Sequence, residues 1–112
     1  MRRGEVWMAN LDPTRGDEIA KDRPVVILNR DSAGVLNLRV VVPLTSWQPH
    51  FAGADWLVRL DPTPANGLRN ASAADTFQVR SISTLRFRRQ VGVLSADELA
   101  AVVVALVRTV GG

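Results

Sequence analysis

The sequence predicts a mainly β protein: a small, strongly bent sheet or barrel followed by one C-terminal helix. Short apolar segments recur along the chain and are separated by turn-forming residues, which is typical of such sheets. Only the last segment repeats its apolar residues with the period of a helix. At 112 residues the chain is long enough to bury about two-thirds of its unfolded surface, so we expect a single domain over residues 1–112.

Three strands are expected in the first half of the chain. Residues 5–11 alternate loosely between apolar and polar, which predicts a strand with one buried face. Residues 24–28 are apolar on both faces and predict a strand in the middle of the sheet. Pro24 suits the start of that strand, because it has no N–H to donate. Residues 38–44 are rich in β-branched side chains and predict the third strand.

The second half predicts further short strands between polar segments. A long loop is expected at 46–55, followed by a fourth strand at 56–60 and a fifth strand at 71–82. A basic patch at 86–89 then leads into a last short strand at 91–94. This regular spacing of short strands and turns again favours a small, strongly bent sheet or barrel.

The terminal helix is expected over residues 95–110. Ser95 and Glu98 form the S-x-x-E pattern of a capping box, which marks its first turn. Apolar residues cover both faces rather than one stripe, yet about 16 residues are too few to span a bilayer. We therefore expect one face to pack on the sheet and the other to meet a second copy of the chain, forming a homodimer.

Composition limits the chemistry and the location. The chain has no cysteine, so a disulfide, a thiol nucleophile and a zinc knuckle are unavailable. No apolar stretch follows Arg2 and Arg3, so we expect no signal peptide, no membrane partner and a cytoplasmic location. Of the 14 basic residues only Lys21 is a lysine. Arginine fits phosphate and stacks on bases, which favours a local anion-binding groove, although a GC-rich genome also enriches arginine.

The charged loop at 10–24 is the first candidate for a functional site. It places seven charged residues between two apolar runs and is longer than most hairpin loops, and such loops are often functional. A solvated loop with cancelling charges is an equally good interpretation. The strand at 40–46 adds a second polar group, because it ends in Thr45 and Ser46.

The inventory of catalytic residues is short. His50 is the only histidine, so an acid–base pair of histidines is impossible, and no G-x-S-x-G motif indicates a serine nucleophile. The acidic residues of the charged loop match no calcium-loop spacing and alternate with basic ones, so we expect no metal and no other cofactor. Arginine, a carboxylate and hydroxyls remain.

That set suits cleavage of RNA by its own 2′-OH, which can attack the adjacent phosphorus without a metal ion. The protein must then align the groups and stabilise charge on the phosphorane oxygens. Arg23 would be the charge stabiliser or proton donor. Glu18 is the easier general base, since the pKa of arginine exceeds about 12.

Four stretches of the sequence resemble the MazF/PemK toxins of bacterial type II toxin–antitoxin systems. They are RRGEVWMANLDPTRGDE…KDRPVVIL at 2–28, VVVPLTS at 40–46, NGLRNASAADTFQVRSIS at 66–83 and RRQVGVLSADEL at 88–99. The resemblance covers nearly the whole chain. It implies an SH3-like β-barrel of the CcdB/PemK type with appended helices, a homodimer, and inhibition by a cognate acidic antitoxin.

The resemblance also implies an activity. The family consists of metal-independent, sequence-specific endoribonucleases, or mRNA interferases, that cut single-stranded RNA. Their products carry a 2′,3′-cyclic phosphate and a 5′-hydroxyl, and the cleavage arrests translation and growth. Carried over to this chain, the catalytic residues are Arg23, Thr45 and Glu18, and the RNA contacts are Ser46, Ser72, Gln78 and Arg80.

Lys21 and Trp47 are additional candidates for RNA contact. Lys21 adds a positive charge to the loop, and Trp47 is able either to stack on a base or to cover the core. Trp7 and Trp56 are expected in the core.

Two other functions remain open at this point. Gyrase-poisoning toxins share the barrel and act through an aromatic group at the end of the terminal helix, whereas residues 107–112 contain none. A non-catalytic RNA-binding barrel would not require Arg23 and Thr45 together.

Overall fold

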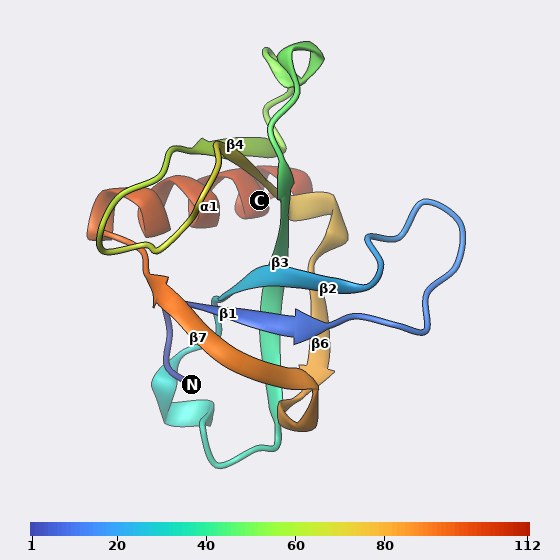
Figure 1. The fold of residues 1–112 in the computed structure, drawn as a ribbon, viewed down its shortest axis with the longest axis vertical. Helices are drawn as coiled ribbons and strands as arrows, with labels where there is room; N and C mark the ends of the chain where they lie inside the picture. Colours follow the sequence, from blue (N-terminus) through green and yellow to red (C-terminus); the bar gives the residue numbers. More distant parts are fainter.

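The computed structural model describes all 112 residues and consists of seven strands and one α-helix, joined by loops and short 3₁₀ turns (Figure 1). The strands are β1 (Glu5–Asn10), β2 (Asp22–Ile27), β3 (Leu38–Ser46), β4 (Leu57–Leu60), β5 (Ser72–Asp75), β6 (Arg80–Ser83) and β7 (Phe87–Val93). The helix is α1 (Ala96–Thr109), and the 3₁₀ turns are η1 (Asp31–Ala33), η2 (Pro49–Phe51), η3 (Thr76–Gln78) and η4 (Thr84–Arg86). The predicted class, mainly β with a C-terminal helix, is confirmed.

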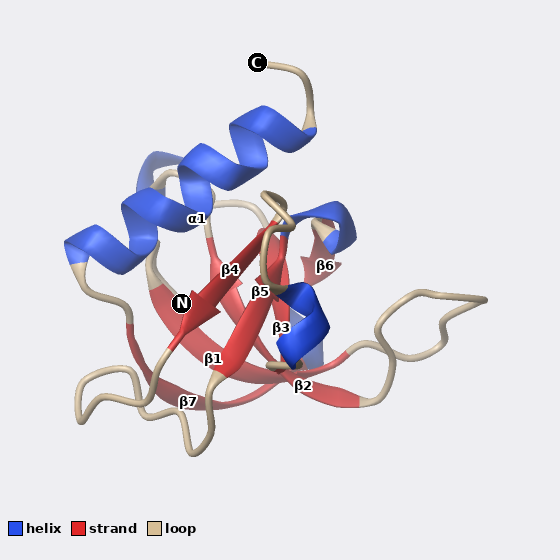
Figure 2. Cartoon of the chain, turned by 90° about the horizontal axis from the view of Figure 1, so that it is seen from above, coloured by secondary structure: helices blue, strands red, loops and turns tan.

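The seven strands form one antiparallel, strongly bent sheet. Their order is β4-β5-β3-β2-β1-β7, and β6 also pairs with β3. The hydrogen-bonded path therefore runs from β4 to β7 without closing on itself. Figure 2 shows the sheet curling under α1, which lies across one end.

β2 is the central strand that its apolar run predicts. It lies between β1 and β3, and Val25 to Ile27 are completely buried. The strand begins at Asp22 rather than at Pro24, which corrects the predicted start. Pro24 is tolerated inside β2 because β3 pairs only with Val25–Ile27, so no partner on that side needs its missing N–H.

The single strand predicted at 71–82 is wrong, because η3 divides it into β5 and β6. Both halves pair with β3: Leu44 lies opposite Ala74, and Val41 opposite Arg80. Between these pairs β3 advances three residues and its partner six, so the turn η3 bulges out of the ladder. The Asp75 side chain stabilises the turn by accepting a hydrogen bond from the Phe77 backbone N–H at 3.1 Å.

The basic patch lies mostly within β7 instead of preceding it, so the strand predicted at 91–94 begins earlier, at Phe87. β7 ends the strand order and pairs on one side with β1, from Glu5↔Val93 to Ala9↔Phe87. Charged side chains are well tolerated on such an edge strand, where they also discourage pairing with other chains. Arg88 and Arg89 are both exposed there.

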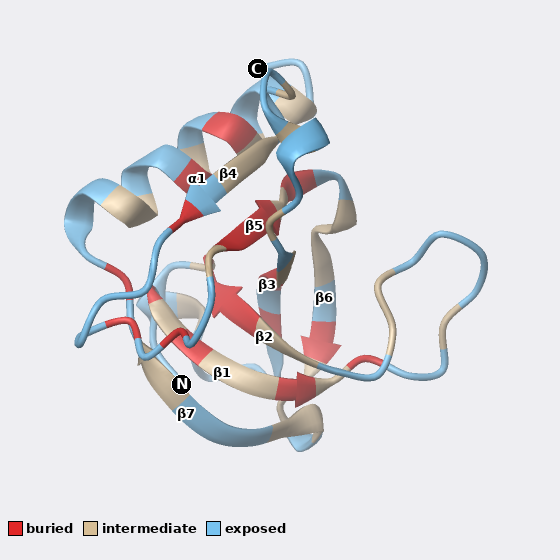
Figure 3. Cartoon of the chain, turned by 45° about the horizontal axis from the view of Figure 1, so that its top comes forward, coloured by how far each residue is buried: buried red, intermediate tan, exposed pale blue.

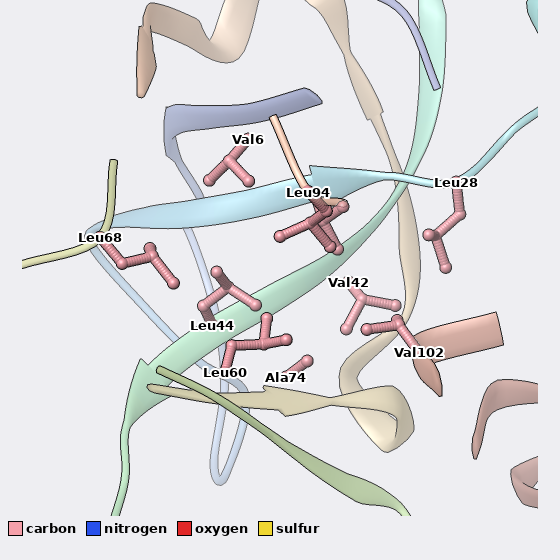
Figure 4. Close-up of a cluster of buried hydrophobic side chains, with 10 residues drawn as sticks. Val6, Leu28, Val42, Leu44, Leu60, Leu68, Ala74, Leu94 and Val102 are labelled. Atoms are coloured by element: carbon pink, nitrogen blue, oxygen red, sulfur yellow. The ribbon is translucent and has the colours of Figure 1, made fainter. Parts of the chain in front are cut away.

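The larger core cluster lies between the bent sheet and the helix (Figure 4). It contains Val42 and Leu44 of β3 and Val102 of α1, all at most 1% exposed. The helix begins with the predicted capping box: the Glu98 backbone N–H donates to the Ser95 hydroxyl, and the Ser95 N–H donates to the Glu98 carboxylate. This reciprocal cap fixes the start of α1 over the core.

The outer face of α1 carries the exposed apolar residues that the sequence predicts. Val102 and Ala105 are buried, whereas Val104 is 51% and Val107 45% exposed. Figure 3 shows buried and exposed segments along α1. No helix is both long and apolar enough to cross a membrane.

The two tryptophans predicted in the core differ in their placement. Trp7 is half-buried against the second core cluster and donates its indole N–H to Glu5 at 2.9 Å. The prediction for Trp56 is wrong, since this side chain is 39% exposed. Trp56 precedes β4 and packs edge-to-face on Phe77 of the bulging turn, with ring centroids 5.8 Å apart, so both rings stay at the surface.

Candidate functional site

A cavity of about 310 Å³ lies where the end of β3 meets β2, β7 and the loop before β5. Its polar lining consists of Arg23, Thr45, Ser46, Arg69, Asn70, Ser72 and Arg89. Three of these side chains are guanidinium groups, and no aspartate or glutamate lines the cavity. The site therefore has a positive electrostatic potential and favours an anionic ligand.

Arg23 and Thr45 reach the cavity from neighbouring strands. The ladder between β2 and β3 ends at the pair Val25–Pro43. Two residues further in the same register, Arg23 comes opposite Thr45. From this point β3 pairs with β5, with Thr45 opposite Ala73, and it no longer pairs with β2. The cavity occupies this divergence of the two strands.

The backbone fixes the base of the Arg23 side chain. Arg23 lies within β2, in the extended geometry expected for a residue before proline. Its Nε donates to the Ala20 carbonyl at 3.3 Å, and the side chain is only partly buried. The guanidinium is thus held at the end of a rigid strand while it remains open to a ligand.

Ser46 and Ser72 enter the cavity as a cross-strand pair. They lie opposite each other at the end of the β3–β5 ladder. Ser72 is buried, and its hydroxyl donates to the Asn70 carbonyl at 2.9 Å. The structure thus brings four of the predicted site residues into one cavity: Arg23, Thr45, Ser46 and Ser72.

Glu18, Gln78 and Arg80 line a separate hollow at the base of the loop between β1 and β2. Gln78 accepts a hydrogen bond from the Ile19 N–H at 3.1 Å, and Arg80 donates to Gln78 at 2.9 Å. The Glu18 carboxylate accepts from the Arg15 N–H at 2.6 Å. In this arrangement Gln78 and Arg80 hold the loop, and Glu18 does not line the cavity of Arg23.

Lys21 and Trp47 also lie outside the cavity lining. Lys21 is exposed at the end of the long loop and has a left-handed backbone conformation, with φ at 67°. Trp47 follows β3 and is half-buried. The Arg59 guanidinium lies 5.3 Å from its ring centroid, and Phe51 packs edge-to-face on it at 5.7 Å. Arg59 and Phe51 therefore already occupy part of the Trp47 surface.

A third hollow contains His50, Trp56 and Asp75. Burial raises the pKa of the Asp75 carboxyl, against the opposing effect of hydrogen bonds from the backbone N–H groups of Phe77 and Gln78. No group of three histidine, cysteine, aspartate or glutamate side chains is arranged to hold a metal ion.

Sequence reasoning missed Arg69, Asn70 and Arg89 as residues of the cavity. Arg89 belongs to the basic patch, but its sequence position does not reveal which element it faces. Arg69 lies two residues after Gly67, a glycine with φ at 68°. The only local sequence signal near Arg69 was therefore the glycine of a sharp turn, which does not indicate a binding site. Contacts between distant parts of the chain bring both arginines to the lining of one cavity.

This cavity can bind a phosphate-bearing ligand and stabilise negative charge on it, because phosphate oxygens accept hydrogen bonds from guanidinium groups and hydroxyls. Fold and site together define a class: a bent antiparallel sheet with a terminal helix and an arginine-lined anion pocket at the strand ends.

Known proteins of this class share sequence and fold with the chain. Residues 2–110 match the family described as the PemK-like, MazF-like toxin of the type II toxin–antitoxin system. The endoribonuclease MazF9 of Mycobacterium tuberculosis is 39% identical over 106 residues, which covers 89% of this chain and 87% of the relative. The chain therefore belongs to the PemK-like, MazF-like family of type II toxins.

Solved structures of the family share the fold over the whole chain. MazF from Deinococcus radiodurans superposes with a TM-score of 0.82 at 26% identity, covering 100% of this chain and 97% of that one. A MazE–MazF structure from the same organism gives a TM-score of 0.74 at 25% identity, covering 99% and 96%. The predicted fold class is thus confirmed by comparison as well as by topology.

Proposed function

We propose that this toxin is an endoribonuclease that cuts single-stranded RNA by attack of a 2′-OH on the adjacent phosphorus, without a metal ion. The products would be a 2′,3′-cyclic phosphate and a 5′-hydroxyl. The observation that carries the proposal is the register that sets Arg23 opposite Thr45 in an arginine-lined cavity. The relative of 39% identity, which is named an endoribonuclease, supports it.

Arg23 and Thr45 would stabilise the charge that develops during the attack. The 2′-oxygen forms a bond to phosphorus and loses its proton, while the 5′-oxygen leaves and must gain one. Negative charge therefore grows on the phosphorane oxygens, where a preset guanidinium and hydroxyl are most effective. Ser46 is suited to donate to a neighbouring oxygen of the RNA. The Ser72 hydroxyl, which donates to the Asn70 carbonyl, would accept a hydrogen bond from the RNA.

Glu18 would accept the proton of the 2′-OH, because a carboxylate is a better general base than a guanidinium. No carboxylate lines the cavity, so we infer that the loop carrying Glu18 moves toward the cavity when RNA is bound. Lys21, at the end of that loop, would then approach the RNA backbone. Gln78 and Arg80 would contact the RNA along the hollow at the base of the loop. Trp47, which directly follows β3, would stack on a base with the part of its ring that Arg59 and Phe51 leave free.

The toxin is proposed to act as a homodimer formed through α1. Val104 and Val107 expose an apolar face, and a groove of about 510 Å³ separates α1 from β4, with Leu57 and Val58 on the other side. Burying this face removes apolar surface from water, which is the main driving force for stable association. A second copy presents the same face, so a twofold interface is self-complementary.

The inhibitory partner is proposed to be an acidic, partly disordered segment of the cognate antitoxin. A cavity lined by three arginines and no carboxylate attracts such a segment, which would order on binding. The MazE–MazF structure from Deinococcus radiodurans contains a MazF together with a second protein, which supports the existence of a protein partner. The cytoplasm, where messenger RNA is translated, is the proposed site of action.

The test is incubation of the purified toxin with single-stranded RNA in excess EDTA, followed by analysis of the product ends. We expect cleavage with 5′-hydroxyl and 2′,3′-cyclic phosphate ends. Cleavage that requires a divalent cation, or that leaves a 5′-phosphate, would refute the proposed mechanism. RNA binding without cleavage would point instead to a non-catalytic RNA-binding barrel.

A further inference from the structure

Two arginines of the cavity have no part in the chemistry proposed for Arg23. Arg69 belongs to the loop between β4 and β5, and Arg89 belongs to β7, yet both line the same cavity as Arg23 and Thr45. They come from segments 20 residues apart in sequence.

Neither side chain is used to hold the fold together. Arg39 donates to three backbone carbonyls within 3.1 Å, and Arg80 and Arg86 likewise donate to carbonyls of distant segments. In contrast, the guanidinium groups of Arg69 and Arg89 make no hydrogen bond and no ion pair with the protein. Two unpaired guanidiniums facing one cavity repel each other, so an anionic ligand that lies between them would be bound strongly.

Close packing of the two segments sets the positions of these arginines. A Cβ added to Gly67 would lie 2.0 Å from the Val91 carbonyl oxygen of β7, so only glycine permits this approach. Asn66, next to it, is completely buried, and its side chain donates to the Asp61 carbonyl and to Glu98 at 2.9 and 3.0 Å. The loop that carries Arg69 is therefore pinned against β7.

The β7 side of the contact is shaped by two bulges. Met8 pairs with Arg89 and Trp7 with Gln90, and the β1–β7 register shifts on either side of these two pairs. A bulge bends its strand and redirects the neighbouring side chains, and bulges are over-represented beside functional sites. Arg89 thus lies on a distorted stretch of β7 that meets the loop of Arg69.

We propose that Arg69 and Arg89 together bind the phosphodiester adjacent to the one that is cleaved. This subsite rests on the proposed endoribonuclease function. RNA carries a second phosphate beside the scissile one, and the planar fork of arginine matches two of its oxygens at once. Arg23 acts at the reacting phosphorus, whereas Arg69 and Arg89 hold the neighbouring phosphate and so fix the register of the strand.

The test uses an RNA oligonucleotide that the wild-type toxin cuts, made uncleavable by one 2′-deoxyribose at the cleavage site. The phosphates on either side of the scissile phosphate are replaced, one at a time, by neutral methylphosphonates. The dissociation constant of the toxin is measured for each oligonucleotide. We expect one flanking replacement to weaken wild-type binding by about tenfold, as for one phosphate contact, since each contact also releases counterions. In the Arg69→Ala/Arg89→Ala variant, the same replacement should change binding by less than about twofold.

Arg88→Ala is the matched control, because Arg88 is an exposed arginine of the same strand that neither lines the cavity nor bonds to the protein. It should retain the full methylphosphonate effect. The double variant should also lower the slope of log affinity against log salt by about 0.7, the value for one phosphate on single-stranded nucleic acid. Its thermal unfolding midpoint should be no lower than that of wild type, since neither side chain bonds to the protein and their removal relieves the repulsion between them.

Two results would overturn the subsite while leaving the proposed function intact. One is a methylphosphonate profile that is the same in the wild type and the double variant, although both cut RNA. The other is unchanged RNA binding with lost affinity for an acidic antitoxin peptide, which would assign the pair to the antitoxin. If the wild type neither binds nor cuts RNA, the proposed function and the subsite fail together.

Discussion

Arg23 and Thr45 lie in cross-strand register two residues beyond the last pair of the β2–β3 ladder. The ladder stops at Val25–Pro43, and beyond it β3 pairs only with β5. The two side chains therefore belong to strands that are hydrogen-bonded to each other on one side of this position and diverge on the other side. A ligand held between them is fixed by the sheet itself rather than by a loop.

Arg23→Ala is expected to slow the chemical step far more than it weakens RNA binding. A guanidinium that stabilises the phosphorane contributes mainly in the transition state, so the single-turnover rate should fall on the order of 10²- to 10⁴-fold. RNA affinity should fall by about tenfold, as for one phosphate contact. Arg23→Lys should recover little, because an ammonium cannot make the bidentate contact. A near wild-type rate for Arg23→Ala at saturating enzyme would make Arg23 a binding residue only.

Thr45→Val is expected to reduce the single-turnover rate by about 10- to 100-fold, since it removes the hydroxyl and keeps the branched shape. Thr45→Ser keeps the hydroxyl and is the matched control, with a rate within about threefold of wild type. The unfolding midpoints of both variants should be measured, because Thr45 lies within the β3–β5 ladder. Equal rates for the two variants would show that the hydroxyl has no catalytic role.

Gly67→Ala is expected to lower both stability and RNA affinity. The left-handed φ of 68° disfavours alanine, and the added Cβ would clash with the Val91 carbonyl 2.0 Å away. The clash should push the loop of Arg69 off β7 at a cost of about 1–3 kcal/mol in the free energy of unfolding. Gly53→Ala is the control: it has a similar positive φ of 89° with no atom within 4 Å of the added Cβ. Denaturant unfolding of both variants distinguishes the clash from backbone strain alone.

Val104→Glu is expected to convert a dimer into a monomer. The substitution places a charge in the middle of the exposed apolar face of α1, where its burial against a second copy would be unfavourable. Sedimentation of the wild type at micromolar concentration should give about twice the 12.2 kDa chain mass. Ser81→Glu, on the exposed part of β6, should leave the mass unchanged. A monomeric wild type would refute the proposed interface.

The elements that follow local patterns were predictable from the sequence. The apolar run at Val25 to Ile27 predicted the central strand, and the Ser95–Glu98 capping box predicted the start of the helix. The family resemblance selected Arg23 and Thr45, which the register of β2 and β3 then places together. These cases depend on periodicity, capping or motif, all of which are local signals.

The remaining features depend on contacts between distant residues. η3 interrupts the predicted fifth strand because the buried Thr76 hydroxyl bonds to the Trp56 carbonyl at 2.8 Å, and this contact draws the chain out of the ladder. Arg69 and Arg89 line the same cavity because the loop at Gly67 packs against Val91 of β7. Glu18 follows a family motif, but its position depends on where the long loop lies. None of these contacts leaves a pattern in the local sequence.

The most direct test of the proposed mechanism is replacement of one ribose by 2′-deoxyribose immediately 5′ of the scissile phosphate, with the reaction run in EDTA. If the 2′-oxygen is the nucleophile, the native RNA is cut at its full rate and the deoxy RNA is bound but not cut at that position. The measurement is the single-turnover rate for the two oligonucleotides, with a deoxyribose two positions away as the control. Cleavage of the deoxy RNA at the same phosphate would contradict the mechanism and point to water or another external nucleophile.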